Sequence, residues 1–96
     1  MENQVRYKHF TPNKSEQQVC SNILNIINEL APSDSYVQAK VAQTPDGSYN
    51  AVISVNASCK DFKSESSGFS LLNSFQKAQQ GIMSEMNQWK SHRFLS

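Results

Sequence analysis

Two cysteines and two histidines are the residues of this chain best suited to covalent chemistry, namely Cys20, Cys59, His9 and His92. A cysteine or serine nucleophile needs a neighbouring base and a further group that orients this base. The histidines stand near opposite ends of the sequence, and neither a Gly-x-Ser-x-Gly motif nor a Cys/His family signature is present. We therefore predict no catalytic residue and no enzymatic activity. We interpret His9 as a structural side chain that points inward, and His92 as an exposed side chain at a helix end.

Metal and cofactor sites are not predicted either. The cysteine, histidine and carboxylate side chains show no close pairs at the spacing of metal ligands. No glycine-rich loop precedes a helix in the form that binds phosphate. The two distant cysteines indicate free thiols in a reducing compartment. Residues 1–4 do not resemble the start of a signal peptide, and no apolar run approaches the roughly 20 residues of a membrane span. We expect a cytoplasmic protein with no membrane partner and no small-molecule substrate.

The basic residues suggest a different chemistry, the binding of a polyanion. The formal net charge is only +1, so such binding would depend on a local cluster of basic residues. One candidate cluster lies near the end of the sequence, where Glu85 opposes Lys77, Lys90, His92 and Arg93. Lys14 could join it from the start of an earlier helix. The alternative is an ordinary solvated helix face with charges at the helix end, and both interpretations stay open.

Hydrophobic patterning predicts the elements that must position these side chains. Alternation over residues 5–10, with Val5, Tyr7 and His9 on the inner side, predicts a short edge strand that ends before Pro12.

A helix is predicted over residues 15–30, because its apolar residues recur at helical spacing. Asn13 or Ser15 can serve as the N-cap, and Glu16 in the first turn suits the helix dipole. Pro32 ends the helix. The apolar stripe comprises Val19, Ile23, Ile26, Ile27 and Leu30, widened by Cys20 and Leu24.

Two alternating runs, residues 36–43 and 49–57, flank a Pro-Asp-Gly turn and predict an antiparallel hairpin with one buried face. A weaker strand is predicted over residues 60–66, with Phe62 pointing inward and the charged residues outward.

Ser67-Gly68 is expected to break the chain before a second helix, for which Ser70 is the predicted N-cap. Gly81 lies inside this helix, where it costs about 1 kcal/mol relative to alanine, so it suggests a close approach to the sheet or to the first helix. The apolar stripe of this helix comprises Leu71, Leu72, Phe75, Ala78, Ile82, Met86 and Trp89.

Together these elements predict an α+β fold of the order β-α-β-β-β-α. The economical arrangement is a four-stranded mixed sheet with both helices packed on one face, because each helix has a single apolar stripe. The first strand should lie parallel to the second. No repeat or linker is visible, so we expect a single domain over residues 1–96.

This pattern resembles the family of ribosome hibernation promoting factors and ribosome-associated inhibitors, also called sigma-factor modulation proteins. The resemblance covers nearly the whole chain, as a pattern more than as a motif. It rests on Val37-x-Ala39-x-Val41, the turn Asp46-Gly47, Ala51-x-Ile53-x-Val55, Phe62-Lys63-Ser64-Glu65-Ser66 and Leu71-Leu72-Asn73-Ser74-Phe75-Gln76-Lys77-Ala78.

The resemblance implies a non-catalytic protein that binds ribosomal RNA on the small subunit, in the channel of messenger and transfer RNA, and so silences idle ribosomes. It implies that basic residues of the helices face the RNA. In this sequence the positions that could do so are Lys77, Lys90 and Arg93, with Lys14 and Lys63 as further candidates. The alternative is a protein-protein interaction module on the same fold that has lost RNA binding, since residues 15–30 contain neither lysine nor arginine.

Overall fold

The computed structural model describes residues 4–32, 34–58 and 60–95 of the 96-residue chain, without the side chains at positions 4 and 92–95. Cys59 and the side chains of His92 and Arg93 therefore lie outside the described part. The elements follow the predicted order and are β1 (Gln4–Lys8), α1 (Lys14–Leu30), β2 (Tyr36–Gln43), β3 (Tyr49–Asn56), β4 (Asp61–Gly68) and α2 (Leu71–Leu95).

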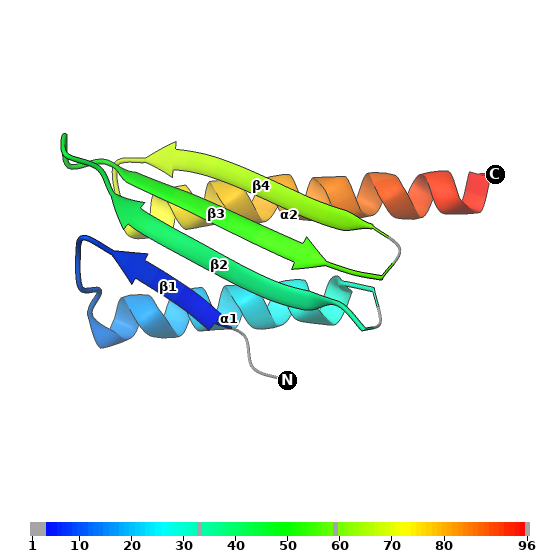
Figure 1. The fold of residues 1–96 in the computed structure, drawn as a ribbon, viewed down its shortest axis with the longest axis horizontal. Helices are drawn as coiled ribbons and strands as arrows, with labels where there is room; N and C mark the ends of the chain where they lie inside the picture. Colours follow the sequence, from blue (N-terminus) through cyan, green and yellow to red (C-terminus); the bar gives the residue numbers. More distant parts are fainter. Residues whose placement is uncertain (1–3, 33, 59, 96) are drawn as a thin grey trace.

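All the strands form one four-stranded sheet in the order β1-β2-β3-β4. β1 runs parallel to β2, whereas β3 is antiparallel to both β2 and β4. Both helices lie side by side behind the same face of this sheet (Figure 1). The structure thus confirms the predicted α+β fold, and no described element covers the opposite face of the sheet. We call that face the open face. No helix within the described ranges is long and apolar enough to span a membrane.

Local turn chemistry closes the β2–β3 hairpin. Gly47 has a φ of +89°, a conformation that glycine adopts at little cost. The Asp46 carboxylate accepts hydrogen bonds from the hydroxyl of Thr44 and from the amide of Ser48, and the Thr44 hydroxyl is the larger cause that lowers the Asp46 pKa. The amide N–H of Thr44 donates to the carbonyl of Ser48 at 2.8 Å, which closes the loop and sets the register of the two strands.

The hydrophobic core fills the space between the sheet and the helices. In β2, Val37, Ala39 and Val41 are buried while the residues between them point outward, as the alternation predicts. Burial of each large apolar side chain contributes about 1.5–3 kcal/mol, so the core is the main interaction that holds the two layers together. The other core residues are Cys20, Ile23, Leu24, Ile27, Ala51, Ile53, Val55, Phe62, Leu71, Phe75, Ala78, Ile82 and Met86.

α1 begins with a capping box that selects Asn13, not Ser15, as the N-cap. The Asn13 side chain accepts the Glu16 amide at 2.8 Å, and the Glu16 carboxylate accepts the Asn13 amide at 3.0 Å. The predicted apolar stripe of this helix is wrong at two positions, because Ile26 and Leu30 are 45% and 41% exposed. At 3.6 residues per turn these two side chains fall on the flank of the buried stripe, which is centred on Cys20, Ile23, Leu24 and Ile27.

The end of β1 also differs from the prediction. His9 is not an inward-pointing strand residue; it follows the strand, is exposed and has a φ of +70°. This change in backbone direction turns Phe10 inward instead. The Phe10 ring packs edge-on against Tyr7 and Tyr49, at centroid distances of 5.7 and 5.1 Å. Burial of the apolar phenyl ring of Phe10 is more favourable than burial of the polar imidazole of His9. This difference explains why Phe10, and not His9, points inward.

The junction between β4 and α2 lies slightly later than predicted. Gly68 does not break the chain but forms the last pair of β4, opposite Tyr49. Ser70 is the N-cap, as predicted, because its hydroxyl accepts a hydrogen bond of 3.1 Å from the amide N–H of Asn73. A single residue, Phe69, separates the end of β4 at Gly68 from the N-cap, and its side chain is 81% exposed.

The glycine inside α2 marks a close approach to the sheet, as its position predicted. A β-carbon at Gly81 would overlap the hydroxyl oxygen of Ser64 in β4 and would lie 3.3 Å from the Ser64 β-carbon. Further along α2, Met86 is buried and the Trp89 ring packs edge-on against Phe62 at a centroid distance of 5.8 Å. α2 is thus held to β4 at both points.

We predict that Gly81→Ala and Ser64→Ala are coupled in their effects on stability. In the Ser64→Ala background the hydroxyl is gone, and Gly81→Ala should stabilise the helix by about 1 kcal/mol. In the native background the same change should be less favourable by at least about 0.5 kcal/mol, because the Ser64 hydroxyl must move. Urea unfolding of the four proteins, followed by circular dichroism, measures the coupling. Additive effects would contradict the close approach.

Candidate nucleic-acid interface

The open face of the sheet presents a set of basic side chains. Successive residues of a strand point to opposite faces, so the residues that alternate with buried ones reach the open side. The basic residues there are Arg6 and Lys8 of β1, Lys40 of β2 and Lys63 of β4, and all are exposed. We refer to them as the open-face basic group.

The parallel register of β1 and β2 brings three of these cations together. Arg6 is the partner of Lys40, and Lys8 lies two residues further along β1. Neighbouring strands lie about 4.8 Å apart, so the three charges share a small area. The adjoining Lys8 ammonium, and to a smaller extent Arg6, hold the pKa of Lys40 below its usual value. Such crowding disfavours another proton and favours the approach of an anion.

A shallow depression of about 390 Å³ crosses this face from β1 to β4. Arg6, Lys40 and Lys63 line it together with the polar side chains of Gln38 and Ser54. Lys63 pairs with Ser54, which pairs with Gln38, so these three residues form one row across the sheet. Cationic, amide and hydroxyl groups in one depression are suited to the oxygen atoms of phosphate groups.

Two carboxylates, Asp61 and Glu65, also point to the open side, both from β4. The Glu65 carboxylate accepts a hydrogen bond of 2.8 Å from the Asn50 side chain. Asp61 lies at the start of β4, opposite Asn56. Because both carboxylates belong to the far edge strand, the positive charge is concentrated on the β1–β2 half of the face.

Three predicted RNA-binding residues of the helices have described side chains, and the structure does not gather them into one patch. They are Lys14, Lys77 and Lys90. Lys77 and Lys90 are thirteen residues apart in α2, which is roughly 20 Å along the helix. The Lys90 ammonium donates to the carbonyl of Leu30 at 3.0 Å, at the C-terminal end of α1. The Lys77 ammonium reaches the carbonyl of Ser67 in β4 at 3.5 Å. The two side chains therefore point to opposite sides of α2.

Lys14 and Lys63 are also apart from these two residues. Lys14 begins α1 and lies beside Gln17 and Ser21 on the exposed side of that helix. Arg93 belongs to the last turns of α2, but its side chain lies outside the described part. Of the five predicted residues, Lys63 alone belongs to the open-face basic group.

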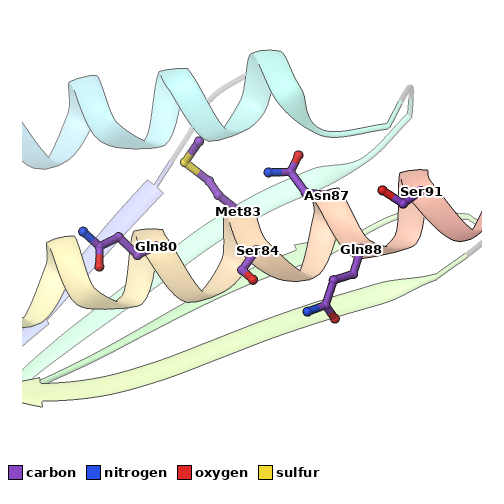
Figure 2. Close-up of a pocket in the computed structure, with 6 residues that line it drawn as sticks. All are labelled: Gln80, Met83, Ser84, Asn87, Gln88 and Ser91. Carbon is purple, nitrogen blue, oxygen red and sulfur yellow. The ribbon is translucent and has the colours of Figure 1, made fainter.

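A depression of about 520 Å³ along α2 has only uncharged lining residues (Figure 2). Met83 and Asn87 point toward α1, whereas Ser84 and Gln88 point away from it. The other lining residues are Gln80 and Ser91. A phosphate backbone is bound mainly through lysine and arginine, so this part of the helix side is poorly suited to RNA.

Arg6, Lys8 and Lys40 are absent from the sequence-based set of site residues, although a signal for them existed. Arg6 and Lys8 alternate with inward-pointing residues, and Lys40 does the same in its own strand. The parallel pairing of the first two strands was predicted, but its register, which sets Arg6 beside Lys40, was not.

Cys20 is in a poor position for covalent chemistry. Cys20 is completely buried, and burial raises the pKa of its thiol. Burial also raises the pKa of the Tyr7 hydroxyl, with the neighbouring Cys20 as a further cause. A buried, protonated thiol is a weak nucleophile. Within the described ranges, no group of three or more His, Cys, Asp or Glu residues could hold a metal ion.

Two solved structures share this fold. The N-terminal domain of Protein Y from Thermus thermophilus superposes with a TM-score of 0.75 at 8% sequence identity, over 90% of this chain and 94% of that one. A ribosomal subunit interface protein from Coxiella burnetii superposes with a TM-score of 0.72 at 4% identity, over 92% of this chain and 98% of that one. No protein-family model and no curated protein matches the sequence. These similarities confirm the fold that the resemblance to hibernation factors predicted.

We predict that the pKa of Lys40 rises toward the ordinary value of 10.5 when Lys8 is replaced by glutamine, because the main cause of its lowering is removed. An NMR titration of the lysine Cε signals measures this change. Since the folded pKa lies below the unfolded one, protonated Lys40 costs stability at neutral pH. That cost should disappear as the pH rises through the folded pKa toward 10.5.

Lys60→Gln is the matched control for this titration. The Lys60 ammonium lies 5.4 Å from the centroid of the Phe62 ring and does not belong to the open-face basic group. Its removal should leave the pKa of Lys40 unchanged. An equal shift in both variants would mean that a general change of charge, not the Lys8 contact, controls Lys40.

Proposed function

We propose that this protein is a non-catalytic, ribosome-associated protein of the cytoplasm that binds ribosomal RNA on the small subunit and modulates translation. The observation that carries this proposal is the similarity in fold to a ribosomal subunit interface protein, 98% of whose chain is covered. The exposed basic side chains, well separated from the two-layer core, supply the chemistry that RNA binding needs.

The mechanism in this proposal is occupancy. Lysine and arginine side chains replace the counterions of the RNA backbone, and the release of these ions favours binding at low salt. The protein then blocks a ribosomal surface by its presence, without making or breaking a covalent bond. Such a mechanism needs neither a metal nor a cofactor.

The residues assigned to RNA through the family resemblance are Lys77, Lys90, Arg93, Lys14 and Lys63, and their role remains part of the proposal. Lys90 has a competing structural role, since its ammonium already binds the last carbonyl of α1. Lys14 and Lys63 are exposed and are available to a ligand.

The second candidate function is a protein-protein interaction module on the same fold. The uncharged depression along α2 favours it, because amide, hydroxyl and thioether groups suit a protein surface better than a phosphate backbone (Figure 2). A protein partner that stays bound after nuclease treatment and in high salt would support this candidate over RNA binding.

We predict that the protein sediments with isolated small ribosomal subunits at low salt and is released as the salt concentration rises. The few cations available should make binding weak at physiological salt. Ultracentrifugation across a salt series, with large subunits as the control, measures the association. If the protein stays in the supernatant while the small subunits sediment at low salt, ribosome association is refuted.

A further inference from the structure

The open face combines two features of a surface for single-stranded nucleic acid. The first is the open-face basic group, which includes three neighbouring cations on the two strands at one edge. The second is Tyr36, the first residue of β2, which is 41% exposed and alternates with buried Val37, so its ring lies on the open side. Single strands are bound by basic grooves that follow the backbone and by aromatic rings on which bases stack.

The spacing of these features fits a short strand. Tyr36, Gln38 and Lys40 follow one another on the open side of β2, so Tyr36 and Lys40 are about 13 Å apart at 3.3 Å per residue. Gln38 lies between them and begins the row that leads to Lys63. A chain of a few nucleotides can therefore reach Tyr36 with one base while its phosphates lie near Lys40 and Arg6.

Other ligands fit these features less well. The wide minor groove of duplex RNA is recognised by shape, and its stacked bases cannot reach an aromatic ring on a sheet. An acidic peptide would meet the cations but would leave Tyr36 without a flat partner. The four-stranded sheet of the RNA recognition motif presents aromatic side chains to unpaired bases in a comparable way.

We propose that the open face of this sheet binds single-stranded RNA, with Arg6, Lys8, Lys40 and Lys63 contacting the phosphates and Tyr36 stacking on a base. This inference rests on the proposed function only for the choice of RNA as the polyanion. It assigns the contact to the sheet, on the side of the molecule opposite the helices.

Fluorescence anisotropy with a labelled oligouridylate of about ten nucleotides tests the proposal. The native protein should bind with a slope of log K against log salt of about −3, since four cations each contribute about 0.7. The double variant Arg6→Gln/Lys40→Gln should bind at least tenfold more weakly and reduce the magnitude of the slope by about 1.4.

Matched variants separate this surface from a general effect of charge. Lys14→Gln/Lys77→Gln removes the same charge from the helix side. Lys60→Gln removes one charge beside Trp89 of α2, away from the open face. Lys60→Gln is the control and should bind oligouridylate within about twofold of the native protein, because Lys60 belongs to neither set of RNA-binding residues. Lys14→Gln/Lys77→Gln should weaken oligouridylate binding less than Arg6→Gln/Lys40→Gln does. If Lys14→Gln/Lys77→Gln weakens binding as much as Arg6→Gln/Lys40→Gln does, the assignment to the open face is wrong.

The stacking contact has its own test. Tyr36→Ala should weaken binding about tenfold without changing the salt slope, whereas Tyr36→Phe should bind like the native protein. A Tyr36→Ala variant with native affinity would overturn the proposal, as would equal affinity for a duplex RNA of the same length or equally effective competition by polyglutamate. Thermal unfolding checks that each variant is folded. If Arg6→Gln/Lys40→Gln is not folded, Lys8→Gln and Lys63→Gln replace it, and their loss of affinity is judged in the same way.

Sedimentation of the same variants with small subunits distinguishes this inference from the proposed function. Binding to oligouridylate through the open face, without association with ribosomes, would support the inference and refute the proposed function. If Arg6→Gln/Lys40→Gln still associates with ribosomes and Lys14→Gln/Lys77→Gln does not, the result would support the proposed function. It would refute the open face as the RNA-binding surface.

Discussion

The parallel pairing of β1 with β2 is the constraint on which both sides of this protein depend. Parallel strands cannot be joined by a tight turn, so the chain must cross over through α1. The crossover helix buries its apolar stripe against the sheet, and α2 then packs beside it on the same side (Figure 1). The same pairing places Arg6 next to Lys40 on the other side. The core and the charged face thus follow from one register.

The crowding of like charges on neighbouring strands is unfavourable by itself. The core does not require it, because Arg6, Lys8 and Lys40 are exposed and a neutral polar residue would satisfy the same alternation. The carboxylates of the open face do not relieve it either, since both belong to β4 at the opposite edge. Departures from local consistency are expected at functional sites, where the ligand supplies the missing charge.

Much of the fold could be predicted from the sequence, because the alternating strands and the Pro-Asp-Gly turn are strong local signals. The errors have local causes. His9 was predicted to point inward in place of Phe10, because an alternating pattern does not reveal the positive φ after β1. Ile26 was assigned to the buried stripe, because an apolar residue on the flank of a stripe gives the same sequence signal. The open-face basic group was missed because it depends on the register between two strands that a whole helix separates, and no local signal in the sequence sets that register. Lys77 and Lys90 were easier to group because both lie in α2, but their side chains point to opposite sides of that helix.

The small net charge of +1 is compatible with RNA binding on one face. At physiological salt the Debye length is about 8 Å, so an approaching phosphate responds to the charges nearest to it and only weakly to the rest of the protein. The carboxylates of α1 and α2 lie behind the sheet and are screened from the open face. Four cations alone give weak and salt-sensitive binding. A stacking contact adds affinity that salt does not remove, which gives Tyr36 a function beside the cations that a fifth lysine could not replace.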